Sequence, residues 1–155
     1  MEYVECPKNW EPLPHQPSVF LAGGITGCPD WQRELVSMLR LTNYAVLNPR
    51  RKNFPMGDPS AAEQQITWEF RHLRKADVIA FWFCRGAVQP IALFELGAWS
   101  QSRKNLVLVG VEPGYPREQD IHIQMKLLGR GVLSSLEEIA NSLKAMDGVF
   151  RMNEQ

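Results

Sequence analysis

The run VIAFWF, residues 78–83, places six apolar side chains in succession. A strand with one face in water alternates apolar and polar residues, whereas a strand covered on both faces is apolar throughout. Coverage on both faces is typical of parallel sheets, because the helices that connect parallel strands pack over the two faces. The run therefore predicts a buried strand of a parallel sheet, and with it an α/β fold.

Strand and helix patterns alternate on both sides of this run. Strands are expected where short apolar runs stop at turn residues, and helices where apolar residues recur at helical spacing. Further strands are expected over residues 18–22, 45–47, 106–111 and 131–133, and helices over residues 30–39, 61–76, 90–101 and from Ser135 onward. This alternation predicts an open, doubly wound parallel sheet of about five strands in three α/β/α layers.

Chain length and proline content divide the sequence into three segments. The 155 residues suit one domain with a full core, and the hydrophobic content of 45% is ordinary for a globular protein. Residues 1–17 contain four prolines, which forbid a regular helix, so a Pro-rich extended arm is expected there. The domain itself is expected over residues 18–146, and a C-terminal tail over residues 147–155.

The charges and the cysteines argue against several classes of protein. Seventeen basic residues balance seventeen acidic ones, which argues against binding to nucleic acid or to an anionic membrane surface. No apolar run approaches the length of a membrane span. Cys6, Cys28 and Cys84 are too few and too scattered for a disulfide framework or a zinc site, so a packing role and a reducing compartment are expected. These features predict a cytoplasmic protein.

Three predicted loops lie at the edge of the sheet where doubly wound folds bind ligands, and they span residues 23–29, 48–60 and 84–89. The turn GGITG, residues 23–27, can be a ligand loop or a purely structural turn, and both interpretations stay open. It lacks the GxGxxG pattern. The next strand ends in Asn48 rather than in an acid, so NAD-dependent hydride transfer is not expected.

A basic run, Arg50, Arg51 and Lys52, follows the second predicted strand at the same edge. Arg50 and Arg51 can grip a phosphate, although a solvated basic face is the more frequent role of such a run. His72 has no cysteine or acid at ligand spacing, so no metal site is expected. No cofactor is expected either.

Most tryptophan and phenylalanine side chains are expected in the core, but some can stack on a nucleobase. Trp68, Trp82 and Trp99 surround the acidic positions described next, and at least two of them are expected in the core. The residues expected to contact a substrate are Gly23, Gly24, Ile25, Asn48, Trp68, Phe83 and Gln89.

The stretch PIALFELGAW, residues 90–99, holds one carboxylate, Glu95, and no other charged residue lies between Arg85 and Arg103. Desolvation disfavours the charged form of an acid in such company. Glu69 precedes the VIAFWF strand, and both acids can approach the same crevice. Two carboxylates at one cleft suit glycosidic bond cleavage, one as the nucleophile and the other to orient the sugar or to move a proton. The alternatives are an arginine partner for Glu95 and a solvated helix position for Glu69.

Three motifs together resemble one known family. A strand ending in FLAGGITG, residues 20–27, an acid eight residues before Asp77, and the closing FELGAW, residues 94–99, resemble the nucleoside 2-deoxyribosyltransferase family and its nucleotide N-glycosidase relatives. The resemblance implies a flavodoxin-like or Rossmann-like fold. It also implies an enzyme that exchanges or hydrolyses the base of a nucleoside with retention, through a covalent glycosyl-enzyme. A neighbouring subunit typically completes the active site in this family, so the resemblance implies a homo-oligomer, a dimer or larger.

The resemblance assigns roles to single residues. Glu95 matches the nucleophile, Glu69 matches an acid near the sugar that is more often aspartate, and Gly23 and Gly24 match the loop beside the sugar and base. Six residues before the nucleophile, the transferases carry an aspartate that bonds the base and can help to protonate it, where this sequence has Gln89. An amide can hold the edge of a base but cannot deliver a proton.

Three functions therefore stay open. The first is cleavage of the N-glycosidic bond of a (deoxy)nucleoside or nucleotide, with transfer of the sugar to another base or to water. The second is a non-catalytic nucleotide sensor on the same fold, favoured if Gln89 marks a loss of chemistry. The third is a hydrolase of another N-glycoside, such as NAD. The first is the main prediction, because two acids flank the VIAFWF strand.

Overall fold

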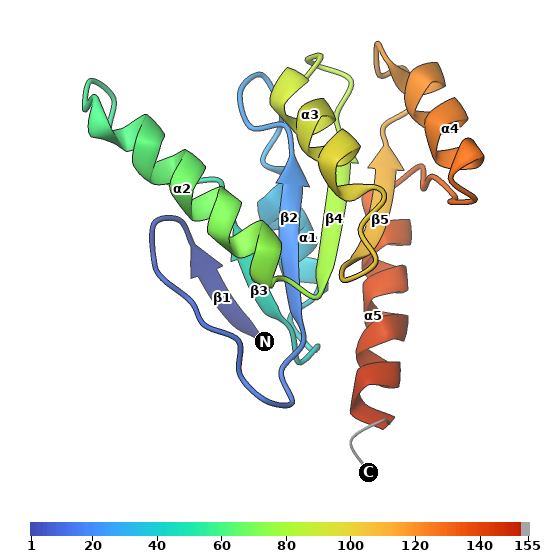
Figure 1. The fold of residues 1–155 in the computed structure, drawn as a ribbon, viewed down its shortest axis with the longest axis horizontal. Helices are drawn as coiled ribbons and strands as arrows, with labels where there is room; N and C mark the ends of the chain where they lie inside the picture. The colour runs from blue at the N-terminus through green and yellow to red at the C-terminus, as the bar shows by residue number, and fades with distance from the viewer. Residues whose placement is uncertain (153–155) are drawn as a thin grey trace.

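The run VIAFWF forms β4 (Val78–Phe83), which lies between β2 (Ser18–Gly23) and β5 (Leu106–Val111) with all six of its residues buried. The computed structural model describes residues 1–152 (Figure 1). Its sheet is parallel throughout, in the order β1-β3-β2-β4-β5, with β1 at Glu2–Glu5 and β3 at Ala45–Asn48. The helices are α1 (Trp31–Met38), α2 (Ser60–Lys75), α3 (Pro90–Trp99), α4 (Glu118–Leu127) and α5 (Leu136–Met152).

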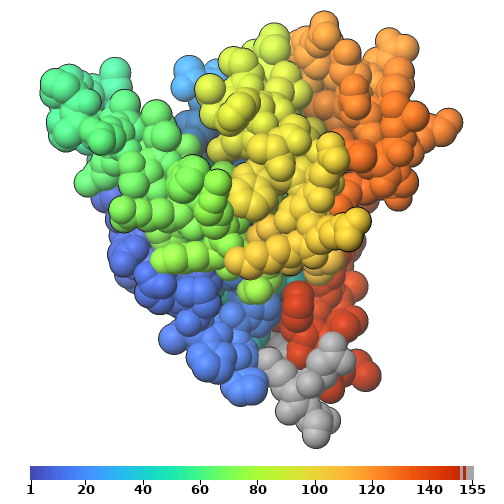
Figure 2. Space-filling model, viewed as in Figure 1, coloured from blue at the N-terminus to red at the C-terminus, as the bar shows by residue number. Residues whose placement is uncertain are grey.

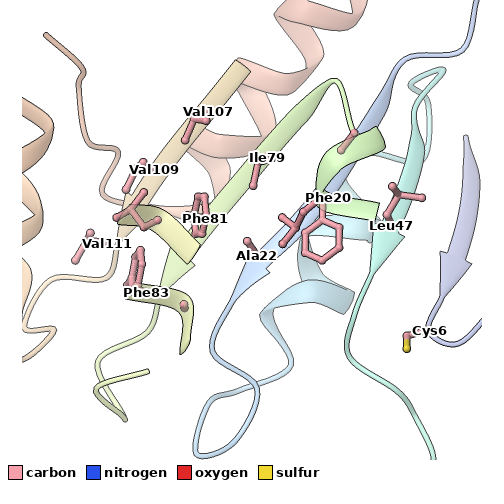
Figure 3. Packing of buried hydrophobic residues seen from close by; sticks show 14 of the residues in the cluster. Cys6, Phe20, Ala22, Leu47, Ile79, Phe81, Phe83, Val107, Val109 and Val111 are labelled. Carbon is pink, nitrogen blue, oxygen red and sulfur yellow. The ribbon is translucent and has the colours of Figure 1, made fainter. Parts of the chain in front are cut away.

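Helices cover both faces of the sheet. Ile79, Phe81 and Phe83 of β4 pack in one core with residues of α2, α3 and α4, and Figure 3 shows side chains of this core on the strands. The alternate residues Ala80 and Trp82 pack in a second core with residues of α1 and α5. Because each strand sends alternate side chains to opposite faces, the continuous apolar run supplies both cores. The predicted doubly wound, three-layer α/β/α fold is confirmed.

The first strand of the sheet lies within the segment that was expected to be an arm. Residues 2–5 pair in parallel with β3, from Glu2 beside Ala45 to Glu5 beside Asn48. The prolines of the segment begin only after Cys6, so they leave the hydrogen bonds of β1 intact. Three side chains of the segment are buried in the core, namely Val4, Cys6 and Trp10.

Two further elements differ from the expectation. Residues 131–133 form only an isolated bridge between Leu133 and Gly110, so the fifth strand of the sheet is β1. The helix α4 was not predicted. The last helix, α5, continues through Met152 into the expected tail over residues 147–155, whose last three residues lie outside the described part of the chain. Among residues 1–152, no helix combines the length and apolar character needed to cross a bilayer.

Candidate active site

A cavity of about 550 Å³ opens at the carboxyl ends of β2 and β4. The chain passes from β2 to β3 on one side and then crosses to β4 on the other, so the order of the strands reverses at this point. Doubly wound sheets bind ligands at such a reversal. The loops after β2 and β4 and the helices α2 and α3 line the cavity, which brings together the predicted residues Gly23, Gly24, Ile25, Glu69, Gln89 and Glu95.

The two carboxylates reach the cavity from helices on the same face of the sheet. Glu95 lies in the second turn of α3, which begins at Pro90, a residue well suited to a first helical position. Glu69 lies in the second half of α2. Both side chains line the cavity and both are half-buried.

Burial sets the electrostatics of this pair. Desolvation and, secondly, the negative charge of Glu69 raise the pKa of Glu95 to about 7. Burial also raises the pKa of Glu69, and a hydrogen bond from Gln65 opposes that rise. Among the described residues, no cation forms an ion pair with either carboxylate. The structure therefore gives no support to an arginine partner for Glu95.

The glycine turn packs so closely against β4 and the neighbouring loops that no side chain would fit at Gly23 or Gly24. A Cβ atom on Gly23 would lie 2.2 Å from the carbonyl oxygen of Trp82, and one on Gly24 would lie 2.3 Å from Sγ of Cys28 and 2.5 Å from Cδ of Gln89. The carbonyl oxygen of Gly24 accepts a hydrogen bond from Nε1 of Trp31. The turn is thus both a structural junction and a wall of the cavity.

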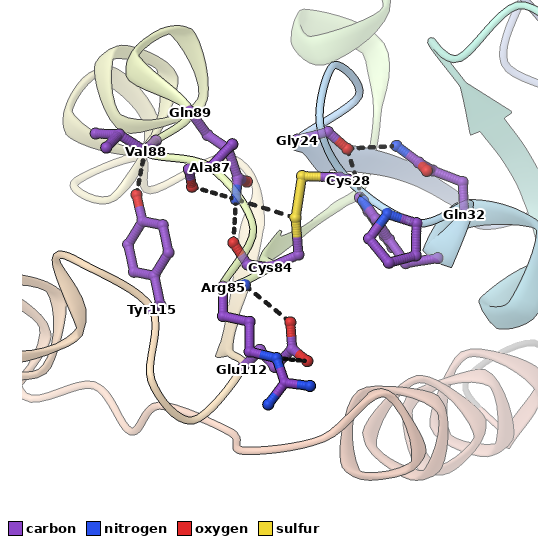
Figure 4. Close-up of a disulfide and its surroundings, with 12 residues drawn as sticks. Gly24, Cys28, Gln32, Cys84, Arg85, Ala87, Val88, Gln89, Glu112 and Tyr115 are labelled. Carbon is purple, nitrogen blue, oxygen red and sulfur yellow. Dashed lines mark hydrogen bonds and ion pairs between the residues drawn. A yellow bond between two sulfur atoms is a disulfide. The ribbon is translucent and has the colours of Figure 1, made fainter.

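Gln89 has a fixed side chain with one free acceptor. Its backbone is left-handed, with φ 57° and ψ 59°, at the N-terminus of α3. Nε2 donates to the carbonyl oxygens of Cys84, at 2.7 Å, and Ala87, at 3.1 Å (Figure 4). Oε1 is buried and has no hydrogen-bond partner in residues 1–152. Because both neighbours are acceptors, they fix which end of the amide is the nitrogen, and the unpaired oxygen lies beside Gly24.

A disulfide joins the two loops that meet at the cavity. Cys28 follows β2, Cys84 follows β4, and Figure 4 shows their bond beside Gln89. The expectation that all three cysteines serve only in packing is wrong for these two, because their sulfur atoms are covalently linked. Cys6 is a free, buried thiol. The cytoplasmic location was argued in part from the cysteine count, and it stays a prediction.

Three residues expected to contact a substrate do not line this cavity. Trp68 packs in the core, where its ring centroid lies 5.9 Å from that of Phe20. Its Nε1 donates a hydrogen bond to the carbonyl oxygen of Lys8. Phe83 is fully buried. Asn48 lines a neighbouring hollow of about 620 Å³ that shares Ile25 with the cavity.

The basic run also lies at the neighbouring hollow. The guanidinium of Arg50 donates to the carbonyl oxygens of Pro29, at 2.7 Å, and Cys28, at 3.3 Å, so it fixes the loop before α1. Arg51 donates to Oε1 of Gln64, and its Nη1 is buried without a hydrogen-bond partner in the described part of the chain. Of the two arginines, Arg51 has the freer donor for an anion. Residues 1–152 contain no cluster of histidine, cysteine and acidic side chains able to hold a metal ion.

Sequence reasoning missed Gln65, which contacts Glu69 without lining the cavity itself. Its Nε2 donates to Oε1 of Glu69 at 2.7 Å. Gln65 lies four residues before Glu69 on α2, and residues at this spacing share a helix face. This spacing on a predicted helix could have indicated a contact between Gln65 and Glu69.

The family comparison covers this site. A family model described as nucleoside 2-deoxyribosyltransferase like matches residues 16–115. The matched part contains Glu69, Glu95 and both loops of the cavity. No curated protein sequence matches the chain significantly.

Proposed function

Because the chain belongs to the nucleoside 2-deoxyribosyltransferase-like family, we propose that it cleaves the N-glycosidic bond of a (deoxy)nucleoside or nucleotide in the cavity between β2 and β4. The observation that supports this reaction best is the pair Glu69 and Glu95, two carboxylates that line one cavity without a cation between them. Two acids in this arrangement suit a reaction that builds positive charge on a sugar carbon.

In the proposed mechanism, a carboxylate oxygen of Glu95 bonds to the anomeric carbon while the bond from that carbon to the base nitrogen breaks. The electron pair of the broken bond leaves with the base, which then takes up a proton. A second base or a water molecule attacks the glycosyl-enzyme from the vacated face and releases Glu95. Since attack needs the anion, the raised pKa of Glu95 predicts a rate that increases with pH through about 7.

Gln89 supports a proton route that differs from the one in the transferases. Its Nε2 is already used by two carbonyl oxygens, and an amide carries no acidic proton for the base. The departing base then needs its proton from another group or from water. This favours hydrolysis, or a base that leaves without strong acid assistance. The neighbouring hollow with Arg51 supports a nucleotide as an alternative to the free nucleoside.

We also propose that a second copy of the chain covers the mouth of the cavity. Ile66 and Ile91 line the cavity yet are 64% and 67% exposed, and Phe94 of α3 is 74% exposed. Figure 2 shows α2 and α3 side by side on one face of the molecule. An exposed apolar face around a site suits an interface between subunits.

The function is tested with the purified protein and a panel of ribo- and deoxyribonucleosides, their monophosphates and NAD, each with and without free bases. Chromatography should show base release by the wild type and new nucleosides if the sugar is transferred. The variant Glu95→Gln should lose at least about 10³-fold in kcat, because an amide is a poor nucleophile. Glu63→Gln, at an exposed acid of the neighbouring helix, is the matched control and should keep its activity.

Two other outcomes would replace the proposal. Nicotinamide release from NAD alone would favour the other N-glycoside hydrolase. Thermal protection by a nucleotide without any product would favour the sensor, for which the fixed Gln89 acceptor is the supporting observation.

A further inference from the structure

Three elements meet at the side chain of Gln65. On α2, its Nε2 donates to Oε1 of Glu69 at 2.7 Å and to the carbonyl oxygen of Pro49, after β3, also at 2.7 Å. Its Oε1 accepts a hydrogen bond from Sγ of Cys6, after β1, at 3.1 Å. Both hydrogens of the amide nitrogen and one lone pair of the amide oxygen are therefore in use.

The direction of this amide is determined by its neighbours. The carbonyl oxygen of Pro49 can only accept, so it requires the nitrogen of Gln65 on its side. Burial raises the pKa of the Cys6 thiol to about 11, so the thiol keeps its hydrogen at neutral pH and requires the amide oxygen on its side. The remaining amide hydrogen can then only face the carboxylate of Glu69.

This amide is the stabilising contact of Glu69 in the described part of the chain. Two titratable groups interact electrostatically with Glu69, namely Glu95 on α3 and Cys6 after β1, and the charges of Glu5 and Arg51 act on Cys6. None of them forms an ion pair with Glu69 among residues 1–152. A donor that bonds a carboxylate favours its charged form.

We propose that Gln65 is a positioning residue that holds Glu69 as an anion at the cavity, and that Pro49 and Cys6 together fix the direction of the Gln65 amide. As an anion, Glu69 accepts hydrogen bonds from the sugar and does not supply the proton for the base. This division of roles rests on the proposed function. The hydrogen-bonded network itself does not, because it exists in the protein without a substrate.

The network is tested by following the side-chain carboxyl signals of glutamate with ¹³C NMR during a pH titration. The signals of Glu69 and Glu95 are assigned from their loss in Glu69→Gln and Glu95→Gln. In Gln65→Leu, the titration midpoint of Glu69 should rise by about one pH unit, since the donor to its anion is lost. In Gln64→Leu, at the neighbouring glutamine that contacts Arg51 instead, the midpoint should stay unchanged.

Two variants of Cys6 separate positioning from loss of packing. Cys6→Ser keeps a donor and should preserve the midpoint of Glu69, whereas Cys6→Ala leaves only Pro49 to orient the amide and should raise the midpoint by less than Gln65→Leu does. A midpoint of Glu69 that is unchanged in folded Gln65→Leu would overturn the inference, even in an active enzyme. A shifted midpoint in a protein that releases no base would support the inference and count against the proposed function.

Discussion

Glu95 destabilises the fold at the pH where the proposed reaction needs its anion. Its pKa is about 7 in the folded protein, against the usual 4.5 of a free glutamate side chain. A carboxyl with a raised pKa binds its proton more tightly in the folded protein. The contribution of Glu95 to the free energy of unfolding is therefore greatest below pH 4.5, and it decreases as the pH rises toward 7. The residue proposed as the nucleophile thus opposes stability.

We therefore expect Glu95→Gln to be more stable than the wild type at pH 8, by about 3 kcal/mol, since one pKa unit corresponds to about 1.4 kcal/mol. At pH 4 both proteins carry a neutral side chain there, and their free energies of unfolding should differ by less than about 0.5 kcal/mol. Urea unfolding at the two pH values measures both differences. An equal difference at pH 4 and pH 8 would show that Glu95 does not titrate as described.

The sequence alone predicted the two acids of the site but not the hydrogen bonds that hold Glu69. Glu95 was visible because it is a single charge in an apolar stretch, and Glu69 because of its place before the VIAFWF strand. The contact between Cys6 and Gln65 joins residues 59 positions apart, and it depends on a strand that was not predicted. Long-range pairing of this kind leaves no local pattern.

At the scale of elements, the disulfide ties the loop after β2 to the loop after β4, so both walls of the cavity are linked covalently. The bond closes a chain segment with a sequence separation of 56 residues. Closing such a segment restricts the unfolded chain, which stabilises the folded protein by about 2–4 kcal/mol.

Reduction should therefore lower the free energy of unfolding by about that amount, measured by urea unfolding with and without a phosphine reductant. The double variant Cys28→Ser, Cys84→Ser should show the lower stability and no response to reductant. Cys6→Ser, which removes the free thiol, should respond as the wild type does. A wild-type transition that does not move on reduction would contradict this prediction.

The two elements that differ from the sequence prediction have local explanations. In α4, Ile121, Ile123, Met125 and Leu127 recur at every second position, as in a strand. Only Ile121 and Met125 are buried, one helical turn apart, while Ile123 and Leu127 face outward. The strand β1 was missed because the prediction of an arm rested on the proline content of the whole segment, whereas the four residues of β1 lie before its first proline. The long apolar strands, by contrast, were predicted correctly from their composition.

At the scale of the whole molecule, the exposed apolar residues of α2 and α3 predict an assembly of identical subunits. Phe94→Asp should shift the mass in light scattering toward the monomer, because a charge would be buried without a partner in the interface. Leu41→Asp, at a 96% exposed leucine after α1, is the control and should leave the mass unchanged. A wild type that is monomeric at all concentrations would contradict the assembly.

All strands point the same way, so the cavity and the start of β1 lie at opposite poles of the sheet. Figure 1 shows the start of β1 and the end of α5 at the pole away from the loops after β2 and β4. A surface tether joined ahead of β1 would leave the mouth of the cavity unobstructed. Immobilised in this way, the molecule would still present the cavity and the apolar residues around it to a substrate or to the proposed second copy of the chain.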